Sequence, residues 1–334
     1  MNPGALLEVR SLRVEFPTRR GTLLAVDDIS FSIAPGEVLG VVGESGAGKS
    51  LTGAAVIGLL EPPGRIARGE VKLAGLRIDN LPPDEMRKVR GREIGAIFQD
   101  PLTSLNPLYT VGQQLTETIT THLHMSQQQA RSRAIELLAA TGIPAPERRI
   151  DHYPHQFSGG MRQRVVIALA LAAEPKLIIA DEPTTALDVS IQAQIIQLLK
   201  TLCREKRTAV MLITHDMGVI AETADRVAVM YAGRIVEEGA VDDVLEAPAH
   251  PYTRGLLDSV PANNVGARRL NQIPGMTPSL LKLAPGCAFR DRCTHVRARC
   301  AEMPELASMG ERKVRCHFPL AVAAAAHVAQ AGQC

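Results

Sequence analysis

The sequence predicts an α/β fold built around a phosphate-binding loop. An apolar run at residues 38–42 leads directly into a glycine-rich stretch at residues 43–50, and the small and apolar residues that follow suit a helix. Strand-like runs return at residues 176–180 and 209–213, with a helical pattern through residues 191–202 between them. This alternation is typical of parallel βαβ winding.

Residues 1–40 predict an antiparallel β layer at the start of the chain. Apolar and polar residues alternate around Val14 and again around Phe31, as expected for strands with one buried face. A turn at residues 19–21 separates the two stretches. The chain is therefore expected to open with a hairpin.

A helical segment is predicted between the parallel strands. Ser126 is a capping residue, Gly142 is a stop signal, and the apolar residues between them have helical spacing. We expect residues 103–157 to be a helical subdomain inserted into a domain that spans residues 6–265. After residue 236 the strand signals fade. Residues 266–320 predict a small extension with four cysteines, and residues 321–334 predict an alanine-rich tail.

The composition is that of an ordinary globular protein. The chain has 334 residues, of which 46% are hydrophobic, and its 37 basic and 35 acidic side chains leave a net charge of +2. This balance gives no electrostatic reason to expect nucleic acid as the main partner. The longest apolar runs are about half as long as a bilayer span requires, and the N-terminus lacks a signal region. We therefore expect a cytoplasmic protein.

Residues 43–50 match the pattern G-x-x-x-x-G-K-[ST] of a phosphate-binding loop. In such a loop the backbone N–H groups turn toward phosphate oxygens, and the N-terminus of the following helix adds its positive end. Lys49 is expected to reach the β and γ phosphates, and Ser50 to bind Mg²⁺. The predicted nucleotide-binding residues are Gly43, Glu44, Ser45, Gly46, Ala47, Gly48, Lys49 and Ser50.

Polar residues follow two of the predicted strands. Asp181 and Glu182 come after the apolar run at residues 177–180, and His215 comes shortly after the run at residues 210–213. Because α/β proteins bind ligands at the carboxyl ends of their strands, we expect Asp181 to hold hydrated Mg²⁺ and Glu182 to polarise a water. His215 is placed to contact the γ-phosphate. The motifs together predict a protein that binds and hydrolyses ATP.

These motifs resemble those of the ATPase subunits of ABC transporters, over about residues 6–265. The stretch Ser158-Gly159-Gly160 resembles the ABC signature, with Met161 where glutamine is commonest. The resemblance implies a P-loop NTPase fold with an ABC-type antiparallel β layer. It assigns roles to Phe16 (stacking on adenine), Gln99 (Mg²⁺ ligand and coupling residue), residues 186–188 with Asp188 (the D-loop) and His215 (the switch histidine).

The same resemblance implies a mechanism. Two subunits would dimerise head to tail, with ATP held between Lys49 of one subunit and the Ser158 loop of the other. Closure of such a site couples the state of ATP to movement of a bound membrane protein.

Further stretches resemble the dipeptide, oligopeptide and nickel importer ATPases, most closely the first of the two dipeptide-importer subunits. They are FQDPLTSLNPLYTVG at residues 98–112, His250-Pro251-Tyr252-Thr253, and CAFRDRCTHVRARC at residues 287–300. The match extends to about residue 318. It implies a bacterial peptide importer at the cytoplasmic face of the inner membrane, with a second ATPase subunit as a heterodimer, two membrane permease subunits and an external solute-binding protein. Dipeptides, longer peptides, nickel chelate and other small solutes all remain open.

The four clustered cysteines follow the spacing C-x5-C-x6-C-x15-C, at Cys287, Cys293, Cys300 and Cys316. This is wider than the usual spacings for structural zinc, and it lacks the close C-x2-C runs of simple ferredoxins. A cytosolic location argues against disulfides. The importer resemblance favours a [4Fe–4S] cluster, with zinc as the alternative. Because the cysteines are far in sequence from Lys49 and Glu182, we expect a structural or oxidation-sensing role rather than one in ATP chemistry.

Two functions of other classes compete with transport. A soluble ABC ATPase acting on ribosomes or DNA would usually carry paired ATPase domains, a long coiled-coil insertion or a strongly basic arm, whereas this chain has one phosphate-loop motif and none of those features. A nucleic-acid-binding zinc module fused to an ATPase is suggested only by the arginines around the cysteines. Co-purification with membrane proteins would separate these alternatives from transport.

Overall fold

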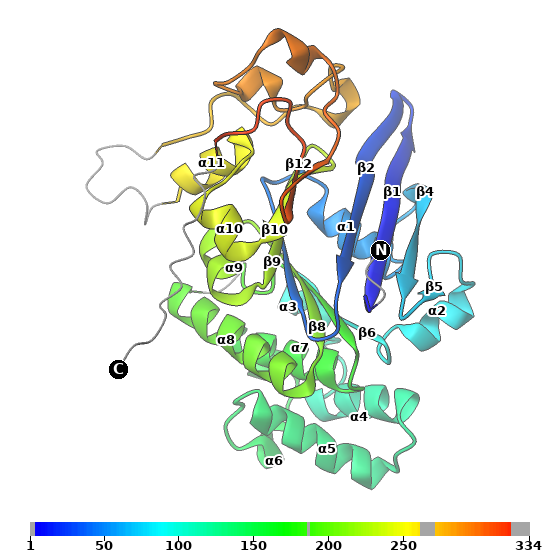
Figure 1. The fold of residues 1–334 in the computed structure, drawn as a ribbon. Helices are drawn as coiled ribbons and strands as arrows, with labels where there is room; N and C mark the ends of the chain where they lie inside the picture. The colour runs from blue at the N-terminus through cyan, green and yellow to red at the C-terminus, as the bar shows by residue number, and fades with distance from the viewer. Residues whose placement is uncertain (1–3, 186–187, 261–270, 322–334) are drawn as a thin grey trace, which may run out of the picture.

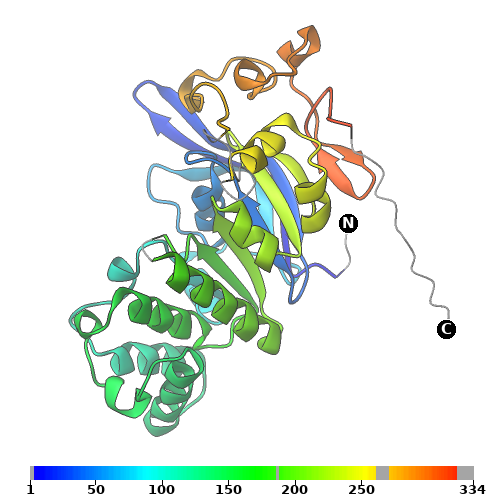
Figure 2. The ribbon, with the colours of Figure 1, turned by 90° about the vertical axis from the view of Figure 1, so that its left-hand side faces the viewer.

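Two β-sheets and the helices around them form the protein (Figures 1 and 2). The computed structural model describes residues 4–185, 188–260 and 271–321. One sheet has four strands in the order β2-β1-β4-β5, and the other has eight in the order β11-β12-β10-β9-β3-β8-β7-β6.

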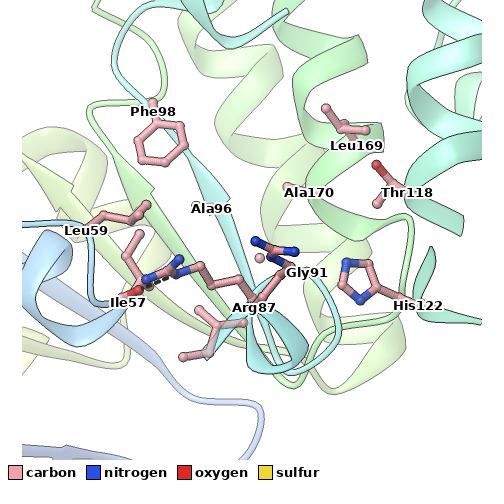
Figure 3. Close-up of a pocket in the computed structure, with 13 residues that line it drawn as sticks. Ile57, Leu59, Arg87, Gly91, Ala96, Phe98, Thr118, His122, Leu169 and Ala170 are labelled. Atoms are coloured by element: carbon pink, nitrogen blue, oxygen red, sulfur yellow. Dashed lines mark hydrogen bonds between the residues drawn. The ribbon is translucent and has the colours of Figure 1, made fainter. Parts of the chain in front are cut away.

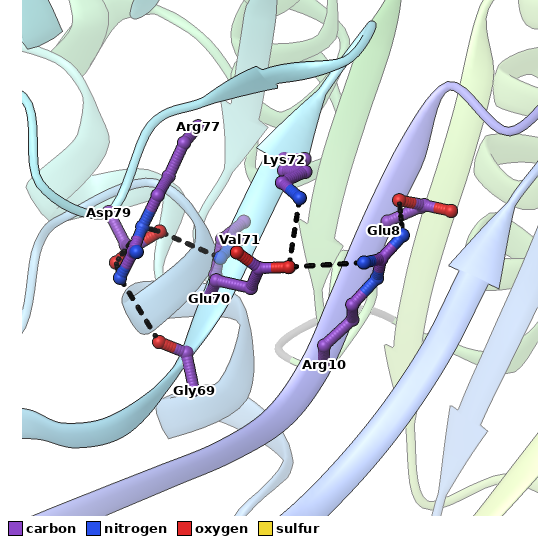
Figure 4. A network of polar contacts seen from close by, with 8 residues as sticks. All are labelled: Glu8, Arg10, Gly69, Glu70, Val71, Lys72, Arg77 and Asp79. Atoms are coloured by element: carbon purple, nitrogen blue, oxygen red, sulfur yellow. Dashed lines mark hydrogen bonds and ion pairs between the residues drawn. The ribbon is translucent and has the colours of Figure 1, made fainter.

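The four-stranded sheet is antiparallel, and its strands β1 and β2 form the hairpin that the alternating pattern predicts at the start of the chain. Its strands are β1 (Leu7–Thr18), β2 (Gly21–Ile33), β4 (Arg65–Leu73) and β5 (Leu76–Arg77). Polar side chains form a network across β1, β4 and β5 (Figure 4). The Glu70 carboxylate accepts a hydrogen bond from Arg10 at 3.3 Å and pairs with Lys72 at 2.9 Å. Asp79 accepts a hydrogen bond from the Val71 N–H at 2.8 Å.

The centre of the eight-stranded sheet is parallel. It contains β3 (Val38–Val42), β6 (Ile94–Ile97), β7 (Leu177–Asp181), β8 (Ala209–Thr214) and β9 (Arg226–Tyr231), followed by the antiparallel β10 (Arg234–Ala240). All five residues of β3 are buried, which confirms the predicted central strand. Parallel strands share their carboxyl edge, so the residues that follow β3, β7 and β8 meet there.

The two faces of β3 contribute to two hydrophobic cores. Val38 and Val42 belong to the core that includes residues of α7 (Gly159–Leu171) and α8 (Val189–Lys206), whereas Leu39 belongs to the core shared with α1 (Lys49–Val56) and the antiparallel sheet. The remaining helices of these layers are α2 (Pro83–Val89), α9 (Met217–Thr223), α10 (Val241–Glu246) and α11 (Pro251–Asp258).

A group of helices lies between β6 and β7 in the sequence. It comprises α3 (Pro101–Ser104), α4 (Val111–His122), α5 (Gln127–Ala140), α6 (Pro146–Arg149) and the 3₁₀ turn Pro154–Gln156. Helices α4, α5 and α6 lie at one end of the molecule (Figure 1). Ser126 caps α5 by accepting a hydrogen bond from the Gln129 N–H, and Gly142 follows the helix with a φ of 74°. Both predicted helix signals are therefore correct.

The cysteine-bearing segment contains short 3₁₀ turns and two short strands. The turns are Leu280–Lys282, Arg290–Arg292 and Ala298–Ala301, and the strands are β11 (Ala307–Met309) and β12 (Arg312–Val314). Strand β12 pairs with β10, with Val314 opposite Glu237. Strands β11 and β12 lie where the strand signals in the sequence fade, so they were not predicted. The segment extends the main sheet.

Candidate nucleotide site

The loop between β3 and α1 has the backbone shape that its glycines allow. Gly43 and Gly48 have φ values of 153° and 97°, in the region that favours glycine. A Cβ at Gly43 would lie 2.2 Å from the Met230 carbonyl oxygen, and one at Gly48 would lie 2.7 Å from the Ala25 carbonyl oxygen. Both approaches are to backbone atoms, so the loop cannot carry side chains at these positions.

Lys49 folds back into this loop and is 5% exposed. Its ammonium donates to the carbonyl oxygens of Gly43 at 2.8 Å and Glu44 at 3.1 Å. Burial lowers the pKa of Lys49 below its usual value, although nearby Glu182 and Asp181 act in the opposite direction. The loop therefore surrounds a desolvated cation, which favours an anionic ligand such as a phosphate.

Two side chains with oxygen atoms that could bind a metal lie close together where β7 ends next to α1. The Ser50 hydroxyl donates to the Asp181 carboxylate at 2.9 Å. Burial raises the pKa of Asp181, and the charge of Glu182 acts in the same direction. A divalent cation would favour the ionised form of Asp181. Hydroxyl and carboxylate oxygens are ligands that Mg²⁺ accepts, so these residues fit that metal.

Glu182 is the centre of a hydrogen-bonded group. Its carboxylate accepts from Gln99 at 3.0 Å and from Thr185 at 2.7 Å, and it lies 3.2 Å from the His215 ring nitrogen Nδ1. Its backbone is left-handed, with a φ of 46°. Burial acts to raise the pKa of Glu182, but the hydrogen bonds from Thr185 and His215 outweigh it and hold the pKa below the usual value. The carboxylate is thus ionised and oriented.

Three other predicted positions lie apart from this group. The ring of Phe16 lies against Gly64, where an added Cβ would be 2.5 Å from the ring. Ser158 is exposed and caps α7 by accepting from the Met161 N–H at 3.4 Å. Asp188 is exposed before α8, and residues 186–187 of the predicted D-loop lie outside the described residues.

The two glycines after Ser158 differ in their surroundings: one is exposed and the other packs against α8. Gly159 is exposed at the start of α7, whereas a Cβ on Gly160 would lie 2.9 Å from the Ile191 side chain of α8. Gly160 therefore allows α7 and α8 to approach closely at this point. The exposed edge formed by Ser158 and Gly159 remains accessible to another molecule.

Sequence reasoning missed a contact on the phosphate loop. The Arg292 guanidinium donates to both carboxylate oxygens of Glu44, at 2.6 Å and 2.9 Å. The hydroxyl of Tyr252 accepts from the Glu44 N–H at 2.8 Å. The cysteine-bearing segment, although far from the loop in sequence, thus touches it in space. In the sequence Arg292 is one of many arginines, and nothing there indicates that it is buried next to Glu44.

A groove runs beside the site, between β6 and helices α4 and α7 (Figure 3). Arg90 fixes one wall, because its guanidinium donates to the carbonyl oxygens of Ile57 at 2.8 Å and Gly58 at 2.6 Å. Phe98 lines the groove and is 46% exposed. The next residue in the chain is Gln99, so one short segment connects the groove to the carboxylate of Glu182.

The four clustered cysteines line one small cavity, which they share with His250. The thiol sulfurs of Cys293 and Cys316 accept from backbone N–H groups two residues onward, each at 3.4 Å. Burial raises the pKa of Cys287 and of Cys293, and raises that of Cys316 to about 11. Within the described ranges, no group of three or more His, Cys, Asp or Glu side chains is arranged to hold a metal ion. The predicted cluster therefore remains a prediction.

Family models and relatives match most of the chain. Residues 26–185 match the model for ABC transporters, and residues 236–300 match the C-terminal region of oligopeptide and dipeptide transporters. The dipeptide transport ATP-binding protein DppD of Haemophilus influenzae is 48% identical over 95% of this chain and 96% of its own length. This chain belongs to the ABC transporter ATP-binding family. The oligopeptide transport ATP-binding protein OppD of Bacillus subtilis is 53% identical over 87% of this chain and 82% of its own length.

Solved ABC cassettes share the fold. A dimeric post-hydrolysis state of the ATP-binding cassette MJ0796, bound to ADP and Pi, matches with a TM-score of 0.64 and 31% identity over 70% of this chain and 98% of that one. The chain is thus an ABC-type ATPase with the cassette fold, as predicted. In the part of the chain that the structure describes, no helix is long and apolar enough to cross a membrane.

Proposed function

We propose that this ABC ATPase is the ATP-hydrolysing subunit of a bacterial importer for peptides. Peptides are proposed as the substrates because the chain is similar to dipeptide and oligopeptide transport ATP-binding proteins. This similarity spans both the cassette and residues 236–300. The geometry at the ends of β3, β7 and β8 supports the ATPase part of the proposal, because it gathers a phosphate loop, a metal-binding pair and an oriented carboxylate.

The proposed roles follow from the geometry. Residues 43–50 cradle the phosphates, with Lys49 turning from loop carbonyls to the β and γ phosphates. Ser50 and Asp181 would hold Mg²⁺, with Gln99, which donates to Glu182, as the third proposed ligand, and the ion would neutralise phosphate charge. Glu182 orients the attacking water. His215 contacts the γ-phosphate from its position beside Glu182.

The nucleotide site is completed by a second ATPase subunit. Ser158 and Gly159 are exposed, which suits contact with a nucleotide bound by a neighbour. The exposed Asp188 would lie at the same dimer surface, and Phe16 would stack on adenine. We propose a head-to-tail heterodimer whose closure on ATP drives transport.

The groove at Phe98 is the proposed docking site for a permease subunit. It is partly apolar and exposed, and the chain continues from it to Gln99 and Glu182. A helix seated there would move the hydrogen-bonded group at the ATP site. We propose that the chain acts at the cytoplasmic face of the inner membrane, with two permease subunits and an external solute-binding protein.

We further propose a domain division. Residues 6–265 form the ATP-binding domain, residues 103–157 its helical subdomain, residues 266–320 the cysteine-bearing extension and residues 321–334 a tail. The four thiols of the extension line one cavity, and we propose that they hold a metal centre, although they are not arranged as a metal site in the described part of the chain. Thiolates suit both iron–sulfur clusters and zinc, and either would supply folding energy to a segment with a small core.

Uptake of labelled solutes tests the substrate class. Cells lacking the chain should lose uptake of labelled di- and oligopeptides, and the wild-type gene but not the Glu182→Gln gene should restore it. Labelled nickel chelate serves as the competing solute. Loss of nickel uptake with peptide uptake unchanged would contradict the peptide proposal.

A further inference from the structure

Two side chains from the C-terminal part of the chain, an arginine and a tyrosine, form hydrogen bonds with Glu44 on the phosphate loop. Arg292 lies in the 3₁₀ turn between Cys287 and Cys293, is 7% exposed, and holds the Glu44 carboxylate in a bidentate pair at 2.6 Å and 2.9 Å. Tyr252 of α11 accepts from the Glu44 backbone N–H at 2.8 Å. One loop residue is thus fixed through its side chain and its backbone.

The arginine is itself rigidly held. Its Nε donates to the Pro274 carbonyl oxygen at 2.8 Å, and its Nη1 lies 3.3 Å from the Tyr231 hydroxyl. The ring of Tyr231 packs against those of Tyr252 and Phe289, with centroids 4.6 Å and 5.3 Å away. A planar guanidinium with all its partners in place loses little entropy when it binds a carboxylate.

The ion pair between Arg292 and Glu44 changes the charge next to the proposed phosphate site. An unpaired Glu44 carboxylate on the phosphate loop would repel a polyphosphate, and in a partly buried site this repulsion is poorly screened. The Arg292 guanidinium neutralises that charge at hydrogen-bond distance and keeps it in one position.

We infer that Arg292 is a positioning residue of the phosphate loop, through which the cysteine-bearing segment sets the affinity of the site for ATP. The inference rests on the proposed role of residues 43–50 as the phosphate-binding loop. It gives the segment a part in nucleotide binding, in addition to any metal that it holds.

A double-mutant cycle on the full chain tests the inference, with affinity measured by equilibrium titration of a fluorescent ATP analogue. Arg292→Gln should weaken binding about tenfold, the size expected for losing a charge-assisted pair beside the ligand. Adding Glu44→Gln should restore most of that affinity, since no unpaired carboxylate then faces the phosphates. Arg299→Gln, which removes an exposed arginine of the same segment, is the matched control and should bind as the wild type does.

The outcomes separate positioning from misfolding. Wild-type affinity for ATP in Arg292→Gln would overturn the inference. It would also be overturned if Arg292→Gln lowered the affinity equally in the wild-type background and in the Glu44→Gln background, because Arg292 would then act only through the fold of its segment. Limited proteolysis of both variants monitors that fold. Lys49→Ala tests the underlying proposal separately: if it binds ATP as the wild type does, the loop assignment fails whatever Arg292 does.

Discussion

Gln99 donates a hydrogen bond to Glu182 at 3.0 Å, and it does so from the residue directly after Phe98, which lines the groove beside β6. The carboxylate proposed to orient water is therefore connected by one hydrogen bond to a surface proposed to bind the permease. A shift of the segment at the groove changes the position of the Gln99 amide. The same contact gives a physical route for coupling in both directions.

Gln99→Ala should separate ATP hydrolysis from transport. The amide donor is lost, but Thr185 and His215 still hold the Glu182 carboxylate, so basal turnover by the purified chain should fall only several-fold. In the assembled transporter, peptide-stimulated turnover should fall by about tenfold or more. Gln129→Ala, at a capping position of α5, a helix that does not line the groove, is the control. Full stimulation in Gln99→Ala would remove the proposed route.

Lys49→Ala and Glu182→Gln should fail in different ways. The first removes a charged donor from the phosphate loop and should weaken ATP binding about tenfold to hundredfold. The second keeps the phosphate contacts but removes the ionised group acting on water, so binding should persist while turnover falls at least about a hundredfold. Nucleotide titration and phosphate release measure the two effects. Wild-type turnover in Glu182→Gln would contradict the role given to that carboxylate.

The pH profile of the ATPase should depend on Thr185. Hydrogen bonds hold the pKa of Glu182 below its usual value, so the carboxylate is ionised at higher pH and its contribution to kcat/KM is lost only as the pH falls through that lowered pKa. Thr185→Val removes the 2.7 Å hydrogen bond, raises the pKa of Glu182 and moves the acid limb to higher pH. Thr185→Ser keeps the hydroxyl and should keep the wild-type profile. An acid limb unmoved in Thr185→Val would show that the bond does not set this pKa.

Gly159→Asp should act across the dimer. Gly159 is exposed at the start of α7, so the monomer should fold and bind ATP with wild-type affinity, while the new carboxylate repels the neighbour's nucleotide. Size-exclusion chromatography of the Glu182→Gln protein with the second ATPase subunit and ATP would report the dimer, and adding Gly159→Asp should abolish it. Loss of ATP binding by a folded Gly159→Asp monomer would contradict a site shared between subunits.

Local patterns predicted much of the fold because their causes are local. The buried β3, the glycines after it and the capped helix after Ser126 each depend on residues close in sequence, and each is found as predicted. The pairing of β12 with β10 was not predicted, because β12 has three residues, too few to show a period. The Arg292 contact with Glu44 joins residues 248 positions apart, and only the folded chain brings them together.

The roles of Gln99 and Ser158 came from the ABC resemblance rather than from pattern. A lone glutamine after a strand carries no chemical signal of its own, and its partner Glu182 lies 83 positions away. By contrast, the roles of Lys49, Ser50 and Asp181 were predicted from residue type and spacing, because the loop pattern and a strand that ends in carboxylates are typical of phosphate and Mg²⁺ binding. The structure brings those three to the same edge of the sheet.

The last prediction concerns the cysteine cavity. Anaerobically purified protein should be brown and contain about four irons per chain, bound by Cys287, Cys293, Cys300 and Cys316. Cys293→Ser should lose the iron and make the segment at residues 271–321 sensitive to protease, because a small segment depends on its metal for folding energy. The ATP affinity of Cys293→Ser should then fall as in Arg292→Gln, since Arg292 is the neighbouring residue and needs a folded segment to reach Glu44.

Metal analysis after expression in iron-replete medium distinguishes the cluster from zinc, which would leave the protein colourless. Stoichiometric zinc without iron would refute the cluster, and full protease resistance in Cys293→Ser would refute its structural role.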